Sequence, residues 1–374
     1  MTKVLYFIET LYQGGAETLV KDYALLLDKS MFSVVVVCLR RTGSSYEGLL
    51  KDNGIRVIYV SDFFGSYQTF FGRLKNKAAR MAGLYHIFLR KIITSESPDV
   101  IHAHLAVLRF LKFADIKKNI KLLYTVHSEP KKYWHGKTRC SSCEYKACHQ
   151  LIKNKNMQLI ALHDAMRNEV NQLFNVSNTI VINNGIDFTK FENALSKEIV
   201  RSKLQISKEA FVIGHIGRFA EPKNHRFIVD VFVETLKKNP NAFLLLVGSG
   251  PLLAEIKSKV SKFNIEDHVM FLTNRIDVPD LMNAMDVFIF PSVYEGLGIV
   301  LIEAQKMGLP CVISDDVPSA ASVSNLTLAK SLQATPEEWA DSLLNFKVGK
   351  VIYKNLNNWD MNLVVQQLEQ LYLG

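Results

Sequence analysis

The stretch FPSVYEGLGIVLIEAQ, residues 290–305, is the most informative part of the sequence. It joins a short apolar run, 287–290, to a second apolar segment through a turn that contains Gly296 and Gly298. This pattern predicts a buried strand, a glycine-rich turn and a helix that begins at about Gly298. Glycines at such a turn let backbone amides approach an anion at the helix N-terminus, which is the usual place for a phosphate.

Two carboxylates accompany this turn. Glu295 lies in the turn itself, and Glu303 lies one to two turns inside the expected helix. A carboxylate at the second place cannot bind phosphate, but it can accept hydrogen bonds from vicinal hydroxyls such as those of a ribose. The pair therefore predicts a site that holds a nucleotide and its sugar together. The alternative is one carboxylate that stabilises the helix dipole and one surface glutamate.

Outward from this stretch, short β-branched runs recur with helical segments between them in both halves of the chain. The expected strands are 4–8, 34–38, 57–60, 100–104, 122–126 and 159–162 in the first half, and 211–216, 243–247, 269–272, 287–290 and 311–314 in the second. Near-continuous apolar runs are typical of strands covered on both faces, as in a parallel sheet with helical crossovers. The sequence therefore predicts an α/β protein with two doubly wound, Rossmann-like domains.

The turn signal Asn-Asn-Gly at Asn183–Gly185 suggests where the two domains meet. We expect an N-terminal domain over residues 1–188 and a C-terminal domain over residues 189–374. Apolar residues recur at helical spacing near the end of the chain and predict a terminal amphipathic helix over 359–373. We expect this helix to return to the N-terminal domain.

Positive charge is concentrated in the first half of the 374-residue chain. Residues 1–188 hold 26 Lys and Arg against 15 Asp and Glu, a net of +11, whereas the remainder contributes −2 to the total of +9. Residues 70–93 mix aromatic and aliphatic side chains with Lys and Arg and contain no Asp or Glu. Such a segment is typical of contact with an anionic membrane surface or a lipid diphosphate. The alternative is a crossover helix with one face in the domain core, and both interpretations can hold at once.

Five cysteines in so long a chain do not indicate a disulfide framework, and the N-terminus shows no leader pattern. No apolar run is long enough to span a bilayer. We therefore expect a cytoplasmic protein that is peripheral on the inner face of the cell membrane.

Three further sequence blocks occur in a consistent order. Gly217 and Arg218, with Lys223 and Asn224, follow the first strand of the second half; Gly248-Ser-Gly250-Pro follows the next strand; and Gly14-Gly15-Ala-Glu lies near the N-terminus. A guanidinium offers a planar fork of donors and an ammonium a point charge, and both suit a diphosphate. The alternative is an exposed loop with two solvated cations. Together with the seven residues between Glu295 and Glu303, these blocks resemble retaining glycosyltransferases of family 4, the group 1 type.

The resemblance implies a GT-B fold, in which two Rossmann-like domains face each other across a cleft. It implies transfer of a sugar, with retention, from a nucleotide-diphosphate-sugar, a UDP-sugar above all, to a saccharide acceptor on the N-terminal domain. The implied catalytic residues are His127, Arg218, Lys223 and Glu295. The implied nucleotide-sugar-binding residues are Gly14, Gly15, Gly217, Gly248, Gly250, Gly296, Leu297, Gly298 and Glu303. In the family the Arg and Lys neutralise the donor diphosphate, and the histidine lies beside the donor sugar.

The resemblance also suggests a setting in bacterial capsule, O-antigen or exopolysaccharide synthesis, with a lipid-diphosphate-linked acceptor. No Asp-x-Asp motif occurs, so we expect no required metal or other cofactor. A nicotinamide dehydrogenase is disfavoured because G-x-G-x-x-G does not follow the first strand, and nucleic-acid binding because no recognised module is present. A nucleotide-sugar epimerase, a phosphorylase and a non-catalytic partner subunit remain open.

Cysteine and histidine clusters raise the question of a metal. Cys140, Cys143 and Cys148, with His135 or His149 as the fourth ligand, have spacings compatible with a structural zinc site. The alternative is free buried thiols. His102 and His104 alternate on one expected strand and should point the same way. For His104 we expect a place in the lining of the cleft rather than a metal site.

Overall fold

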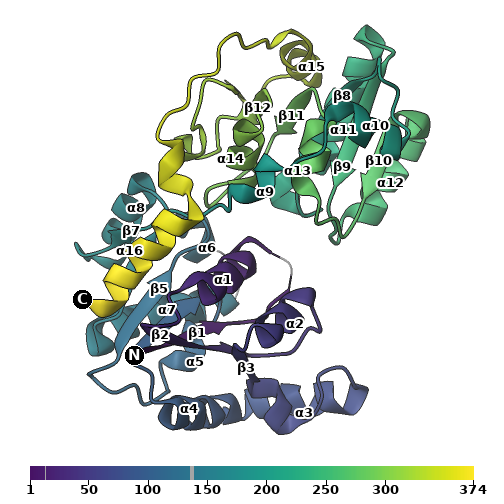
Figure 1. Ribbon diagram of the computed structural model, residues 1–374. Helices are drawn as coiled ribbons and strands as arrows, with labels where there is room; N and C mark the ends of the chain where they lie inside the picture. The colour runs from purple at the N-terminus through teal and green to yellow at the C-terminus, as the bar shows by residue number, and fades with distance from the viewer. Residues whose placement is uncertain (13, 135–138) are drawn as a thin grey trace. The chain divides into compact units, whose positions relative to one another are not determined.

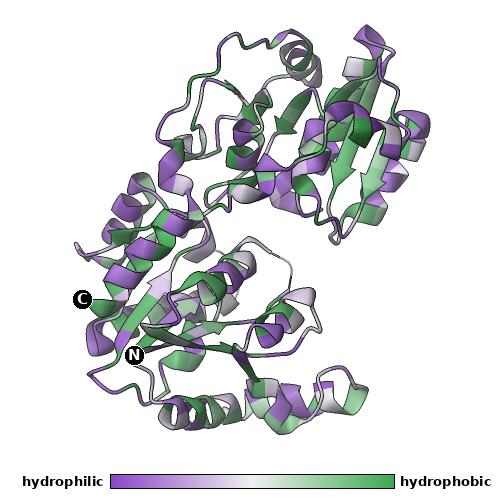
Figure 2. Cartoon of the chain, viewed as in Figure 1, coloured by the Kyte–Doolittle hydropathy of each residue, from purple (hydrophilic) through white to green (hydrophobic). Residues whose placement is uncertain are grey.

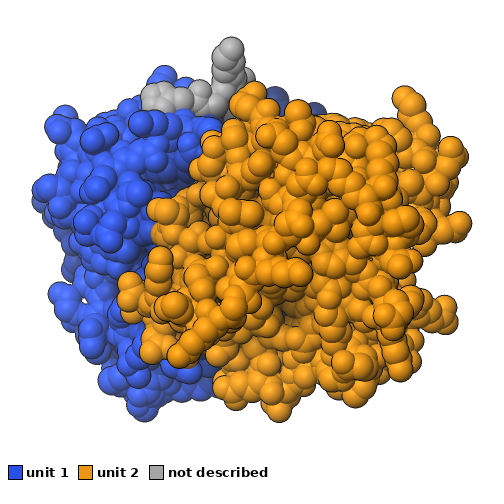
Figure 3. Space-filling view, turned by 90° about the horizontal axis from the view of Figure 1, so that it is seen from above, with its two compact units in different colours: residues 1–185, 361–374 blue, residues 186–360 orange. Residues whose placement is uncertain are grey.

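The structure is a computed structural model and describes residues 1–12, 14–134 and 139–374, without the side chains of residues 139 and 140. The chain divides into two compact units, which Figure 3 shows in different colours. Unit 1 comprises Met1–Gly185 and Met361–Gly374, and unit 2 comprises Ile186–Asp360. The division thus falls three residues before the boundary expected at residue 188, and the last helix belongs to unit 1.

Unit 1 is built on a parallel sheet that has seven strands in the described residues. They are β1 (Thr2–Ile8), β2 (Phe32–Cys38), β3 (Arg56–Tyr59), β4 (Val100–His104), β5 (Lys121–Thr125), β6 (Gln158–Ala161) and β7 (Ile180–Val181). Their order across the sheet is β3-β2-β1-β4-β5-β6-β7, so the strand order reverses between β1 and β4. Tyr6 of β1 lies in register between Val36 and His102, and all three are fully buried.

Helices connect these strands (Figure 1). They are α1 (Gly15–Leu26), α2 (Ser45–Asp52), the 3-10 helix η1 (Val60–Phe64), α3 (Phe70–Met81), α4 (Leu84–Glu96), α5 (Leu108–Leu111), α6 (Pro130–Trp134), α7 (Arg139–Lys155), α8 (Asp164–Phe174) and the terminal α16 (Met361–Leu373). Helix α16 is held to unit 1 by polar contacts as well as by its apolar face. The ammonium of Lys121 donates to the carbonyl of Leu371 at 2.5 Å, and Glu369 accepts from the amide of Asp28 at 2.8 Å.

Unit 2 has a second parallel sheet, with six strands among the residues that the structure describes. They are β8 (Phe211–Ile216), β9 (Ala242–Val247), β10 (Val269–Leu272), β11 (Val287–Phe290), β12 (Cys311–Ser314) and β13 (Thr327–Lys330). The order β10-β9-β8-β11-β12-β13 reverses between β8 and β11. In Figure 2 the strands of this sheet are coloured mainly as hydrophobic, as expected when helices cover both faces.

The helices of unit 2 are mostly short. They are α9 (Thr189–Glu192), α10 (Lys197–Leu204), η2 (Glu221–Lys223), α11 (His225–Lys238), α12 (Leu253–Lys262), η3 (Glu266–His268), α13 (Val278–Asn283), α14 (Ile299–Lys306), η4 (Ser319–Ala321), α15 (Pro336–Asn345) and η5 (Leu356–Trp359).

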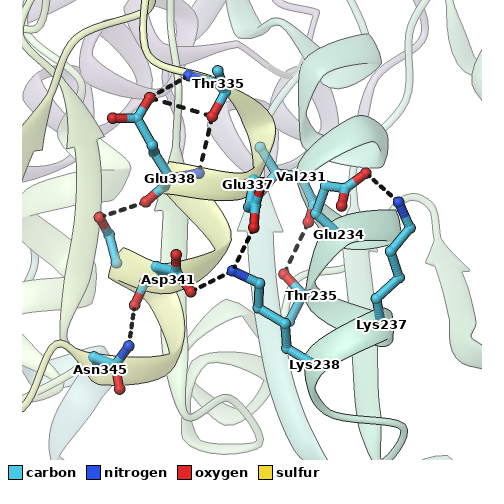
Figure 4. Close-up of polar contacts among 11 residues, drawn as sticks. Val231, Glu234, Thr235, Lys237, Lys238, Thr335, Glu337, Glu338, Asp341 and Asn345 are labelled. Atoms are coloured by element: carbon cyan, nitrogen blue, oxygen red, sulfur yellow. Dashed lines mark hydrogen bonds and ion pairs between the residues drawn. The ribbon is translucent and has the colours of Figure 1, made fainter.

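Helices α11 and α15 pack side by side (Figure 4). The buried Trp339 of α15 lies against Phe227 of α11, with ring centres 5.5 Å apart. Thr335 and Glu338 form a capping box at the start of α15, which satisfies two backbone amides that the helix leaves unpaired. Lys238 of α11 reaches Glu337 at 3.2 Å and Asp341 at 2.6 Å. The capping box defines where α15 begins, and the Lys238 ion pairs and the apolar packing hold α15 against α11.

The expected α/β fold with two parallel sheets is confirmed. Strands β7 and β13 were not predicted, because their residues are short runs that are only half-buried. The basic segment 70–93 forms two helices instead of one stretch, since Gly83 adopts a left-handed conformation (φ +73°) between α3 and α4. The described residues include no helix that is both long and apolar enough to cross a membrane.

Candidate functional site

The reversal of strand order in unit 2 indicates where a ligand would bind. In open α/β sheets, ligands bind beyond the carboxyl ends of the strands at this point. The loop of residues 217–224 follows β8, and the loop of residues 291–298 follows its neighbour β11. The amide of Val293 donates to the carbonyl of Pro222 at 2.8 Å, which joins the two loops. The sequence did not predict this hydrogen bond, because it joins backbone atoms of two distant loops and no residue pattern marks it.

Lys223 and Glu295 meet across these loops. The ammonium lies 2.5 Å from a carboxylate oxygen of Glu295 and 4.9 Å from the ring centre of Phe290. Only 19% of the Lys223 side chain and 12% of the Glu295 side chain are exposed. A cation held between a carboxylate and an aromatic face has few conformations open to it, so it is well placed for a ligand.

Arg218 lies on the same loop and has a different environment. Its side chain is exposed, and within the described ranges its guanidinium makes no ion pair or side-chain hydrogen bond. A guanidinium in this state keeps all its donors for a planar anionic group.

Gly248 and Gly250 allow the loops after β8 and β9 to approach each other, and Gly217 lies close to the ring of His215 on β8. Gly248 has φ +145°, and a Cβ there would lie 2.0 Å from the carbonyl oxygen of Gly217. Gly250 has φ +157°, and a Cβ there would lie 2.4 Å from the carbonyl oxygen of Phe219. A Cβ on Gly217 would lie 2.9 Å from the ring of His215. Because any side chain would push these loops apart, the glycines hold Arg218 and Lys223 in place.

The turn before α14 also needs glycine. Gly298 is the N-cap of the helix and has φ +89°, and Leu297 beside it is buried. The helix begins at Ile299, one residue after the start expected from the sequence, and no side chain caps it. An N-terminus without a side-chain cap attracts an anion. Gly296 lies between Glu295 and this cap.

Glu303 lies inside α14 and is half-buried. In the part of the chain that the structure describes, its carboxylate has no hydrogen bond or ion pair. Burial raises the pKa of Glu303 to about 7, and the nearby Lys190 on α9 lowers it in part. No sequence signal linked Lys190 to Glu303, because the two are distant in the chain. The carboxylate is free to accept hydrogen bonds from a ligand's hydroxyls and titrates near neutral pH.

Two buried histidines lie beneath the Arg218 loop, and the sequence reasoning missed their role. The Nδ1 atom of His215 bonds the carbonyl of Ile289 at 2.8 Å, and its ring lies 4.8 Å from that of His225. Burial lowers the pKa of His215 well below its ordinary value and that of His225 to about 4. Both rings are therefore neutral at pH 7, which leaves the positive charge of this loop to Arg218 and Lys223.

The remaining expected site residues lie in unit 1. Gly14 is the N-cap of α1 and Gly15 its first residue, after the end of β1 where the strand order of this sheet reverses. A Cβ on Gly14 would lie 2.5 Å from a carboxylate oxygen of Glu17. The carbonyl of Gly14 accepts from the amide and the hydroxyl of Thr18, at 2.9 and 2.8 Å.

His127 follows β5, and its Nε2 atom shares a hydrogen bond of 2.9 Å with Nδ1 of His104. Burial lowers the pKa of His127 to about 4 and that of His104 well below its ordinary value. His104 is fully buried, so it does not line a cleft as we expected from the sequence. Its side chain instead holds His127 in place. His127 is thus a neutral imidazole at pH 7, oriented by a second neutral imidazole.

His102 faces the C-terminal helix. Its Nδ1 atom lies 2.7 Å from the hydroxyl of Tyr372, and its Nε2 atom lies 2.7 Å from Oγ1 of Thr125. The Tyr372 hydroxyl in turn lies 3.1 Å from that of Tyr6. Burial lowers the pKa of His102 to about 3. His102 therefore has a structural role, because it joins α16 to the sheet of unit 1.

The zinc hypothesis is tested only in part. Cys143 and Cys148 lie on α7, where burial raises the pKa of the Cys148 thiol, and His149 is 3.2 Å from the hydroxyl of Tyr145. His135 and the side chain of Cys140 lie outside the described residues. Within the described residues, no group of three or more metal-ligating side chains is gathered.

Comparisons with known proteins give the family and the fold. A family model described as Glycosyl transferases group 1 matches residues 196–346, and one described as Glycosyltransferase Family 4 matches residues 13–190. The crystal structure of HepE from Anabaena, in complex with UDP and glucose, has a TM-score of 0.78 to this chain at 20% identity, over 100% of both chains.

Two relatives are similar in sequence. EpsF of Bacillus subtilis (strain 168) is 27% identical over 353 residues, which cover 91% of this chain and 86% of EpsF. The UDP-Gal:alpha-D-GlcNAc-diphosphoundecaprenol alpha-1,3-galactosyltransferase of Escherichia coli is 27% identical over 237 residues, 61% of each chain. The chain therefore belongs to the glycosyltransferases of family 4, the group 1 type, and its two Rossmann-like units form a GT-B fold.

Proposed function

We propose that this protein transfers a sugar from a nucleotide-diphosphate-sugar, with UDP as the favoured nucleotide, to a hydroxyl of a lipid-linked saccharide. The observation that carries the proposal is the pair of cations, Arg218 and Lys223, on the loop after β8 at the strand reversal of unit 2, where Lys223 pairs with Glu295 shortly before the uncapped N-terminus of α14. The Escherichia coli relative is named for a UDP-sugar donor and a diphosphoundecaprenol acceptor, and the HepE structure holds UDP.

The donor diphosphate is the ligand for which these groups are suited. Arg218 binds phosphate oxygens directly, and Lys223 shares its charge between Glu295 and the diphosphate. When the sugar leaves, negative charge develops on the β-phosphate, and both cations and the helix amides near Gly296, Leu297 and Gly298 stabilise it. These charges stand where a divalent cation would otherwise be required, so the reaction is metal-independent.

Glu303 accepts hydrogen bonds from the ribose hydroxyls, since within the described residues its carboxylate makes no hydrogen bond or ion pair. The family resemblance implies roles toward the donor for Gly14, Gly15 and His127 as well. Because its pKa is about 4, His127 acts as a neutral hydrogen-bond partner of the donor sugar and not as an acid. Transfer proceeds with retention of the anomeric configuration, as the family resemblance implies.

The setting that we propose is the synthesis of a bacterial capsule, O-antigen or exopolysaccharide. The Escherichia coli relative is named for a diphosphoundecaprenol acceptor, and a lipid-linked acceptor of that kind lies at a membrane. We therefore place the protein at the inner face of the cell membrane. The net charge of +11 on residues 1–188 favours an anionic partner there.

The test is a thermal-shift screen of the purified protein against UDP-, GDP- and ADP-sugars, followed by assays with the donor that stabilises it. Release of nucleoside diphosphate that requires a lipid-diphosphate-linked saccharide supports the proposal. Conversion of the sugar without an acceptor would indicate an epimerase instead, and phosphate-dependent release of a sugar phosphate a phosphorylase. Binding without any turnover would indicate a non-catalytic subunit.

A further inference from the structure

Helix α3 packs on unit 1 through small and polar residues. Its buried positions are Gly72, Asn76 and Ala79. The side chain of Asn76 donates to the carbonyl of Gly65 at 3.0 Å and accepts from the hydroxyl of Tyr85 at 2.5 Å. A Cβ on Gly72 would lie 1.8 Å from the carbonyl oxygen of Ser66, so the helix approaches the chain closely there. This inner face buries little apolar surface.

The large apolar side chains of α3 point away from the protein instead. Phe70, Phe71, Leu74 and Met81 are 70%, 73%, 57% and 81% exposed. Phe70, Leu74 and Met81 follow helical spacing and lie along one stripe. Single exposed apolar residues are ordinary, but a contiguous stripe opposite a polar inner face marks a surface that contacts something else. Figure 2 shows hydrophobic and hydrophilic residues in alternation along this helix.

Four exposed cations flank the stripe. At 100° per residue, Lys75 lies on one side of the stripe and Arg73, Lys77 and Arg80 on the other. Within the described ranges, none of the four makes an ion pair or a side-chain hydrogen bond. On α4, Arg90 pairs with Asp115 at 2.9 Å, and Lys91 lies 5.1 Å from the ring centre of Phe88. Of the cations in residues 70–93, four of the five without an ion pair in the described ranges are therefore on α3.

An open hollow adjoins the same helix. Its volume is about 620 Å³. Its lining residues are Phe63, Phe64, Gly65, Lys75, Ala78, Ala79, Ala82 and Leu84. An apolar hollow with one cation at its side suits an acyl chain whose headgroup is anionic.

We propose that α3 is an interfacial helix that docks unit 1 on an anionic lipid bilayer. The apolar stripe enters the boundary between headgroups and acyl chains, and the four cations contact anionic headgroups. A second copy of this chain does not fit the surface as well, because it would bring the same four unpaired cations together. The inference rests on the membrane location proposed above, but its test needs neither donor nor acceptor. Its failure would leave the transferase proposal standing.

The test is co-sedimentation of the full chain with vesicles of equal parts phosphatidylglycerol and phosphatidylcholine, and with vesicles of phosphatidylcholine alone. We expect binding to the mixed vesicles only. Two variants should each weaken it by about tenfold or more: one with Arg73→Ser, Lys75→Ser, Lys77→Ser and Arg80→Ser, and one with Phe70→Ser, Phe71→Ser and Leu74→Ser. The matched control replaces four exposed lysines of unit 2 (Lys203→Ser, Lys208→Ser, Lys257→Ser and Lys262→Ser) and should bind like the wild type.

A spectroscopic signal gives the depth of contact. The three native tryptophans are buried, so the emission of a Phe71→Trp variant will shift to the blue on mixed vesicles if residue 71 enters the bilayer. Circular dichroism of each variant confirms that it is folded. Absence of wild-type binding, or equal binding by both variants and the wild type, would overturn the proposal. So would a loss of self-association in the apolar variant without lipid, since that would identify the stripe as an interface between copies.

Discussion

The ammonium of Lys223 lies 2.5 Å from Oε1 of Glu295, although 72 positions separate the two residues in the chain. The pair joins the loops that follow β8 and β11, while Arg218 on the first of these loops makes no ion pair within the described residues. A diphosphate bound as we propose would therefore meet one cation without an ion pair and one that a carboxylate already holds. The two cations should respond differently to substitution.

For Arg218→Ala we expect UDP affinity to fall by about 1.5–3 kcal/mol, roughly 10-fold to 150-fold, because a charge-assisted contact to phosphate is lost. The free energy of unfolding should not change, since the side chain is exposed and, in the described part of the chain, makes no ion pair or side-chain hydrogen bond that its removal would break. Calorimetric titration and chemical denaturation measure the two quantities. Lys203→Ala, at an exposed site on α10, is the control. Unchanged UDP affinity in Arg218→Ala would remove the residue from the donor site.

Lys223→Ala should lower both donor affinity and stability. Removal of the ammonium leaves the largely buried Glu295 without its cation, at a cost of about 1–3 kcal/mol of unfolding free energy. The double variant Lys223→Ala/Glu295→Ala should recover part of that stability but none of the turnover. A double-mutant cycle with denaturation and transfer assays gives the coupling. Strictly additive stability effects would show that the ion pair contributes nothing.

Donor affinity should depend on pH through Glu303, whose pKa is about 7 because of burial. Ribose hydroxyls donate to the ionised carboxylate, so affinity should rise as the pH increases through 7. In Glu303→Gln this rise should be absent. The linked effect on stability has the opposite sign, because the folded carboxyl holds more protons than the unfolded one between about pH 4.5 and 7. The free energy of unfolding should therefore fall across that window in the wild type and less in the variant.

Turnover should persist in excess EDTA, since Arg218, Lys223 and the N-terminus of α14 supply the positive charge. The measurement is the transfer rate with and without chelator. Loss of all transfer, restored by Mg²⁺ or Mn²⁺, would contradict the prediction. A structural zinc at Cys140, Cys143 and Cys148 would have a separate effect, visible as bound metal and as lower stability after chelation.

The packing of the C-terminal helix α16 on its sheet should depend on the hydroxyl of Tyr372. Tyr372→Phe removes the partner of His102 Nδ1 and of the Tyr6 hydroxyl, and all three groups are buried. We expect a loss of about 1–3 kcal/mol in the free energy of unfolding, because buried polar atoms are left unpaired. Denaturation of Tyr12→Phe, at an exposed tyrosine, provides the comparison. An equal and negligible effect in both variants would show that this network does not hold α16.

The sequence by itself determined the architecture and the location of the loops. The valine-rich run Phe32–Cys38 and the similar runs each predict a buried strand without any other information. A strand covered on both faces needs apolar residues at nearly every position. The turn at Gly296–Gly298 is equally local, since backbone conformations with positive φ favour glycine. The half-buried strands β7 and β13 were not predicted from the sequence, because their residues lack that continuous apolar pattern.

Only the tertiary structure decided which side chains meet. The pairing of Lys223 with Glu295, the position of Lys190 near Glu303 and the bond between His102 and Tyr372 join residues from distant parts of the chain. The same holds for the cations of the basic segment: Arg90 forms an ion pair with Asp115, whereas Lys77 forms none with any residue that the structure describes. Sheet order and helix packing set these contacts, and neither is encoded in the spacing of residues along one element. The sequence therefore identified the charged groups, and the fold determined which of them stay free to bind a ligand.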